Sequence, residues 1–105
     1  MLDLRLIRRD PDTVRAALAR RGDAGRLDEV LALDETCRGM RMSVEEMRAE
    51  STRIAKGIGQ AKKAGTAVDP AQEAEARRLR DETTAQEEVL RTAEADRDAL
   101  LLQLP

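Results

Sequence analysis

The sequence predicts an all-α fold, a long antiparallel two-helix coiled-coil hairpin with a short N-terminal helix packed at its base. Ala, Glu, Lys, Leu and Arg dominate the 105 residues, and Phe, Tyr and Trp are absent. Apolar residues also recur at steps of three and four along two long stretches. This composition and spacing are typical of coiled coils, whereas a compact globular core usually contains aromatic rings. We therefore expect one domain, residues 1–105, with its apolar side chains along helix seams.

Residues 1–26 are expected to form an N-terminal segment with one short helix. Asp10 suits an N-cap, and Pro11 suits the first helical position because that position needs no backbone donor. Gly22 and Gly25 are expected to end this helix. Leu2 to Ile7 are expected to be extended and then to turn.

The first long helix is expected over residues 27–64 and is followed by a tip loop over residues 65–69. Gly65 suits a helix C-cap, and Asp69-Pro70 suits the start of another helix. The seam of the first helix advances by an average of about 3.5 residues, which is the coiled-coil period. Its members are Val30, Leu33, Cys37, Met40, Val44, Met47, Ser51, Ile54, Ile58 and Ala61.

The second long helix is expected over residues 70–104, and its seam is weaker because it contains polar residues. Its members are Gln72, Ala76, Leu79, Thr83, Gln86, Leu90, Ala93, Arg97, Leu100 and Leu104. A short loop makes the helices antiparallel neighbours and sets Ile58 against Ala76. The guanidinium group of Arg97 is expected to reach water while its stem packs. An apolar cluster is expected at the base, formed by Leu4, Ile7, Val14, Leu18, Leu27, Leu31, Leu101 and Leu102.

The composition argues against catalysis by this chain. There is no histidine, so His-based acid–base catalysis, His metal sites and a catalytic triad are excluded. Cys37 is the single cysteine, and its seam position predicts a small core residue. The charged N-terminus fits neither a signal peptide nor a membrane span, so a cytoplasmic protein without membrane contact is expected. We expect no catalytic residue, no metal site and no cofactor in this chain.

A basic region points to a nucleic-acid partner. Residues 51–65 contain four basic side chains and no acidic one, although the net charge is −2. Exposed cations of this kind bind phosphates, and the lack of aromatic rings excludes base stacking on Phe or Tyr. The alternative is an ordinary solvated helix face. Gly57 and Gly59 either reflect tolerated fraying or allow a sugar–phosphate backbone to approach closely. The candidate binding residues are Arg53, Lys56, Lys62, Lys63, Arg77, Arg78 and Arg80.

Four segments resemble the N-terminal tRNA-binding arm of bacterial seryl-tRNA synthetases. They are MLDLRLIRRDPDTVRAALARRG, LDEVLALDE, RIAKGIGQAKKAG and LLLQLP, in that order and spacing. The resemblance implies a helical hairpin that holds the long variable arm and elbow of serine tRNA during protein biosynthesis. It implies a homodimeric class II parent enzyme, an ATP-dependent serine–tRNA ligase. ATP and Mg are then expected only for a catalytic domain that this chain lacks. Arg53, Lys56, Lys62 and Lys63 match the family's basic tip.

Two other functions stay open at this point. A protein-interaction or dimerisation coiled coil would use the weak second seam to recruit another helix. A diverged synthetase paralogue in a biosynthetic pathway would carry the same arm. RNA affinity separates the first alternative from the tRNA-binding arm, and sequence beyond Pro105 separates the second.

Overall fold

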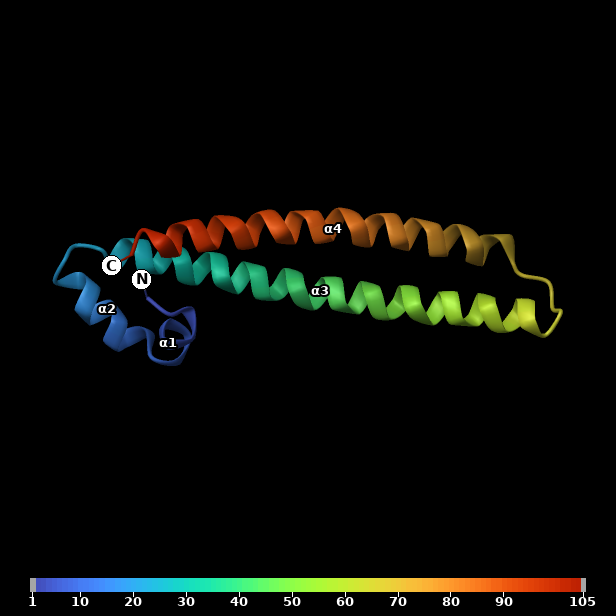
Figure 1. Ribbon diagram of the computed structural model, residues 1–105, viewed down its shortest axis with the longest axis horizontal. Helices are drawn as coiled ribbons and strands as arrows, with labels where there is room; N and C mark the ends of the chain where they lie inside the picture. Colours follow the sequence, from blue (N-terminus) through green and yellow to red (C-terminus); the bar gives the residue numbers. More distant parts are fainter. Residues whose placement is uncertain (1, 105) are drawn as a thin grey trace. The chain divides into compact units, whose positions relative to one another are not determined.

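The computed structural model describes residues 2–104, and the described part contains four α-helices and no strand (Figure 1). The helices are α1 (Leu4–Arg9), α2 (Pro11–Ala19), α3 (Ala24–Lys63) and α4 (Pro70–Leu102). The predicted all-α class with a long packed helix pair is confirmed. The chain divides into two units, and α3 and α4 contribute to both. We call Met1–Gly39 with Leu90–Pro105 the terminal unit and Met40–Val89 the loop unit.

Helix α1 replaces the extended segment expected before α2, so that expectation was wrong. The Asp3 carboxylate caps the helix by accepting a 2.9 Å hydrogen bond from the backbone amide of Arg5. Leu4 and Ile7 are spaced as neighbours on one helix face, and the side chain of Ile7 is fully buried. The short helix forms because one cap and one buried side chain compensate for its length.

Helix α2 begins as expected but ends differently. Asp10 caps it, accepting a 3.3 Å hydrogen bond from the backbone amide of Thr13, and Pro11 occupies the first turn. Gly22 adopts φ 76°, and the amide of Asp23 donates to the carbonyl oxygen of Leu18 at 3.0 Å. This is a Schellman ending, which favours glycine. Helix α3 then starts at Ala24 rather than at residue 27, so Gly25 lies inside it instead of ending α2.

The core of the terminal unit is an apolar cluster drawn from all four helices and the residues after α4. Its buried members are Ile7, Val14, Leu18, Leu27, Val30, Leu101 and Leu104, with Leu2, Leu4, Leu31 and Leu100 packed against them. Leu102 was expected in this cluster, but its side chain is 66% exposed. Leu101 and Leu104 are three residues apart, whereas Leu102 is rotated about 100° from Leu101 around the helix axis.

In the loop unit, α3 and α4 run antiparallel beside each other and are joined by the loop before Pro70 (Figure 1). Gly65 has φ 73°, and the amide of Thr66 donates to the carbonyl oxygen of Ala61 at 2.9 Å, which gives a second Schellman ending. Asp69 caps α4 through a 2.9 Å hydrogen bond from the amide of Ala71. Gly65 thus ends α3 and Asp69-Pro70 starts α4, as the sequence predicted.

The observed register of α3 against α4 differs from the expected one by one residue, since the expected pairing of Ile58 with Ala76 would place Arg48 opposite Gln86. Arg48 of α3 pairs with Glu87 of α4 at 3.3 Å. Val44, Ala76, Leu79 and Thr83 are buried, while Ile54 and Ile58 are half-buried. Gln72 and Gln86 were assigned to the seam, but both are exposed. Glu73 and Glu87 are half-buried instead, because a helix with 3.6 residues per turn drifts from a strict 3.5-residue pattern.

Candidate nucleic-acid interface

The basic residues singled out from the sequence all lie in the loop unit, and all are exposed. They come from the last turns of α3 and the first turns of α4. Lys62 of α3 lines the same surface hollow as Arg77 and Arg80 of α4. The antiparallel pairing therefore brings together cations that are separate in the sequence. The full set is Arg53, Lys56, Lys62, Lys63, Arg77, Arg78 and Arg80.

Two of these cations are neutralised by acids on their own helix. The guanidinium group of Arg53 forms an ion pair with the carboxylate of Glu50. Arg78 donates to Glu75 at 2.5 and 3.0 Å and to Glu82 at 2.7 Å. The hydrogen bond with Glu75 raises the pKa of Arg78, and the same bond lowers the pKa of Glu75. Arg53 and Arg78 therefore contribute little net positive charge.

The other five cations are freer. Lys62 Nζ lies 3.9 Å from Glu73 Oε1, which is a loose ion pair. Within residues 2–104, no acidic side chain lies within salt-bridge distance of Lys56, Lys63, Arg77 or Arg80. These side chains can bind an external anion without first giving up an internal partner.

Five of the seven candidate cations group on two faces of the loop unit, each with a surface hollow. One hollow, of about 340 Å³, is lined by Ile58, Ala76 and four charged side chains. These four, Lys62, Glu73, Arg77 and Arg80, define what we call the Arg80 face. The other hollow is lined by Arg53, Ile54, Gly57, Gln72 and Glu75. We call Glu50, Arg53, Glu75, Arg78 and Glu82 the Arg78 face. The Arg80 face has three basic groups and one acidic group, while the Arg78 face has two basic and three acidic groups.

The described residues offer neither a metal-binding cluster nor an activated thiol beside these cations. In the described residues there is no cluster of three or more Cys, Asp or Glu side chains that could hold a metal ion. Cys37 is 2% exposed, and burial raises the pKa of its thiol, which disfavours the nucleophilic thiolate. What the loop unit offers is a set of exposed cations near the α3–α4 loop, which suits binding to phosphates.

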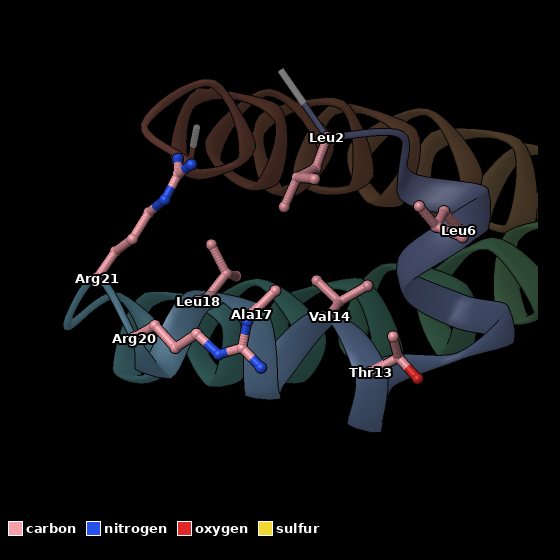
Figure 2. Close-up of a pocket in the computed structure, with 8 residues that line it drawn as sticks. All are labelled: Leu2, Leu6, Thr13, Val14, Ala17, Leu18, Arg20 and Arg21. Atoms are coloured by element: carbon pink, nitrogen blue, oxygen red, sulfur yellow. The ribbon is translucent and has the colours of Figure 1, made fainter.

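A further hollow lies in the terminal unit, between α1 and α2 (Figure 2). Its wall consists mainly of the aliphatic side chains of Leu2, Leu6, Val14, Ala17 and Leu18. Thr13, Arg20 and Arg21 also line it, and among residues 2–104 no carboxylate and no thiol belongs to the lining.

The structure also contains a buried acid that the sequence analysis missed. Asp34 is 3% exposed, and its carboxylate accepts hydrogen bonds from Arg8 at 2.7 and 2.9 Å and from Arg97 at 3.1 Å. The hydrogen bonds from Arg8 are the main reason why the pKa of Asp34 is lowered. The Arg97 side chain is 12% exposed, and its guanidinium group donates to Asp34 and Asp98, two partners that the sequence analysis did not foresee. Asp34 could have been suspected because it falls between Val30 and Cys37 at helical spacing.

Comparison with known proteins identifies the family. The family model described as the seryl-tRNA synthetase N-terminal domain matches residues 1–105. The chain belongs to this family. The resemblance inferred from the four sequence segments is therefore confirmed at the level of the family. None of the helices in the described part is both long and apolar enough to cross a membrane.

Individual members of the seryl-tRNA synthetase family give the same result. The serine–tRNA ligase of Roseiflexus sp. (strain RS-1) is 38% identical over 105 residues, which are 99% of this chain and 24% of that protein. The serine–tRNA ligase of Methanocella arvoryzae is 43% identical over 68 residues, 62% of this chain and 16% of that protein. The crystal structure of seryl-tRNA synthetase from Pyrococcus horikoshii complexed with ATP matches 100% of this chain and 24% of its own, with TM-score 0.84 and 31% identity. The chain thus spans at most about a quarter of these relatives.

Proposed function

We propose that this chain is the tRNA-binding arm of a seryl-tRNA synthetase and that its loop unit holds the long variable arm and elbow of serine tRNA. The observation that carries the proposal is the set of exposed cations around the α3–α4 loop, most of which have no acidic partner among residues 2–104. Family membership supports the same partner.

The mechanism is binding rather than chemistry. Lysine and arginine side chains that neutralise phosphates release condensed counterions, and this release supplies most of the sequence-independent affinity. With no aromatic ring in the chain, recognition relies on the phosphate backbone and on the shape of the RNA. A long variable arm is a shape feature that a rigid array of cations can select.

The remaining partners follow from the parent enzyme. We propose that the arm positions tRNA for a catalytic domain that activates serine with ATP and Mg, in a homodimeric ligase. The arm itself then contributes substrate affinity and no catalytic group. We place this function in the cytoplasm, in protein biosynthesis.

A gel-shift titration against serine tRNA and a tRNA with a short variable arm, at two salt concentrations, tests the proposal. We expect tighter binding of serine tRNA and weaker binding of both at the higher salt concentration. Equal affinity for the two tRNAs would indicate a general polyanion binder. No binding, together with concentration-dependent self-association, would support an interaction coiled coil instead.

The four cations of the α3 end provide the matching variant. Replacing Arg53, Lys56, Lys62 and Lys63 with alanine should weaken binding and flatten its dependence on salt. An unchanged affinity and salt slope would exclude this end of α3 as the contact. Far-UV circular dichroism of the variant checks that the helices remain formed.

A further inference from the structure

We infer that the RNA phosphates bind along the Arg80 face of the loop unit and not along the Arg78 face. The inference rests on the proposed function and specifies which side of the α3–α4 pair contacts the tRNA. It assigns Arg77, Arg80 and Lys62 as phosphate ligands. Arg53 and Arg78, which the sequence analysis named as candidate binding residues, are then not phosphate ligands.

The first argument is the net charge of each face. The Arg80 face carries a net charge of +2 and the Arg78 face −1, from the groups that define them. A helix with its side chains is about 10–12 Å across, and the Debye length at physiological salt is about 8 Å. The charge of one face is therefore largely screened from an anion on the other. A polyanion is attracted to the Arg80 face and repelled by the Arg78 face.

The second argument is the availability of the cations. Arg78 is held between Glu75 and Glu82 by hydrogen bonds of 2.5 to 3.0 Å, and Arg53 is paired with Glu50. A phosphate that bound either arginine would replace an existing ion pair and leave a carboxylate beside the new anion. Arg77 and Arg80 have no such partner within residues 2–104. Phosphate binding there adds charge-assisted hydrogen bonds without removing any.

The third argument is the geometry of the Arg80 face. Arg77 and Arg80 are three residues apart on α4, a spacing that places their Cβ atoms about 5–6 Å apart on one side of a helix. Lys62 enters the same hollow from α3, and the lining between the charges includes Ile58 and Ala76. Lys62 is only loosely tied, at 3.9 Å from Glu73. Two guanidinium groups and one ammonium group can thus bind successive phosphates, because a guanidinium fork matches two phosphate oxygens.

Two double variants of the 105-residue chain test the assignment, because both remove two arginines from the loop unit. Arg77→Ala/Arg80→Ala removes the free arginines of the Arg80 face, and Arg53→Ala/Arg78→Ala removes the paired arginines of the Arg78 face. Affinity for serine tRNA is measured for each over a range of salt concentrations. We expect the first variant to lose on the order of tenfold or more in affinity and about 1.5 from its logarithmic salt slope. The second is expected to stay within about twofold of the unsubstituted chain.

A gain of affinity provides an independent measurement. Glu73 is the one acid of the Arg80 face, so Glu73→Gln frees Lys62 and should raise the affinity a few-fold. Glu46→Gln makes the same change of charge at another exposed position of the loop unit and should leave the affinity unchanged. Circular dichroism before each titration shows that all four variants are folded.

The outcomes are separable. Equal losses in the two double variants, or a larger loss for Arg53→Ala/Arg78→Ala, would overturn the face assignment while leaving tRNA binding intact. Equal effects of Glu73→Gln and Glu46→Gln would also overturn it. Failure of the unsubstituted chain to bind tRNA would overturn the proposed function and the face assignment together.

Discussion

The terminal unit and the loop unit are both built on α3 and α4, but they bury their side chains to different extents. Ile7, Leu27 and Val30 of the terminal unit are 0% exposed. In the loop unit Val44 is 2% exposed, but Ile54 and Ile58, which lie nearer the α3–α4 loop, are only half-buried, because two helices cover a side chain less completely than four. The short helices α1 and α2 supply the extra cover in the terminal unit. Stability is therefore concentrated where the chain has four helices, and the loop unit can carry charge at little cost to folding.

The two units also treat charge differently. The terminal unit buries the Asp34 carboxylate and satisfies it with Arg8 of α1 and Arg97 of α4. The loop unit keeps its charges exposed and pairs some of them within one helix, as in Arg78 with Glu75. A buried ion pair with defined partners fixes how helices meet, whereas exposed cations stay available to a ligand. The contrast is consistent with the proposal that the loop unit carries the binding surface, while the terminal unit contributes most of the buried core.

The largest expected effect concerns the core of the terminal unit. Leu27→Ala should lower the free energy of unfolding by about 2–5 kcal/mol, because it leaves a cavity at a fully buried position. Urea denaturation followed by far-UV circular dichroism measures the change. Leu102→Ala is the control, since that side chain is 66% exposed and should matter by less than about 0.5 kcal/mol. Similar losses in both variants would contradict the view that the terminal unit has a distinct core.

The buried acid gives the second effect. Asp34→Asn should lower the free energy of unfolding by about 1–3 kcal/mol, because Arg8 and Arg97 each lose a charged hydrogen-bond partner. Asp28→Asn removes an exposed acid that pairs with Arg15 and should cost less than about 1 kcal/mol. Thermal or urea unfolding of the two variants compares them directly. A larger loss of unfolding free energy for Asp28→Asn would contradict the view that the Asp34 ion pairs stabilise the packing of α1, α3 and α4.

The same carboxylate predicts a pH dependence with a defined sign. The pKa of Asp34 is lowered in the folded chain, so the folded state binds fewer protons there than the unfolded state does. Its contribution to stability is complete above the unfolded value of about 3.9 and is lost as the pH falls through the lower folded value. The difference in unfolding free energy between the natural chain and Asp34→Asn should therefore shrink as the pH falls from about 6 to about 2. A difference that grows on acidification would contradict this assignment.

The long helices and their loop could be predicted from the sequence because their signals are local. Gly65 ends α3 and Asp69-Pro70 starts α4 through hydrogen bonds to residues close in the sequence. A seam that repeats over many residues can be recognised even when a few of its positions are assigned wrongly. Helix α1 could not be predicted in this way, since its six residues form around Ile7, which is buried by residues distant in the sequence. Leu102 was misplaced because adjacent leucines at the end of α4 leave the buried face ambiguous.

For the candidate interface, composition located the cations but not their pairing. The neutralisation of Arg78 by Glu75 and Glu82 could have been inferred, because acids three and four residues away share its helix face. The grouping of Lys62 with Arg77 and Arg80 required the register of two helices. The partners of Asp34 required even more, since Arg8 and Arg97 lie on different helices far from it in the sequence.

The smallest expected effect is that of alanine at Gly57 and Gly59 of α3, where the effect on stability can be separated from the effect on binding. A Cβ atom added at Gly57 or at Gly59 would meet no atom within 4 Å apart from the adjacent residues and the nearby backbone of its own helix, and neither glycine has a positive φ. Alanine loses less conformational entropy than glycine on entering a helix, so Gly57→Ala and Gly59→Ala should each raise the free energy of unfolding by about 0.5–1 kcal/mol. Urea denaturation measures both.

The two glycines should differ in binding because they belong to different sides of the loop unit. Gly57 lines the hollow with Arg53 and Glu75, whereas Gly59 is three residues from Lys62 on α3 and shares its side of the helix. A phosphate backbone on the Arg80 face would approach Gly59, so Gly59→Ala should weaken tRNA binding a few-fold while Gly57→Ala leaves it unchanged. A loss confined to Gly57→Ala would place the RNA on the Arg78 face. Since both variants are expected to be more stable than the natural chain, unfolding could not explain either loss.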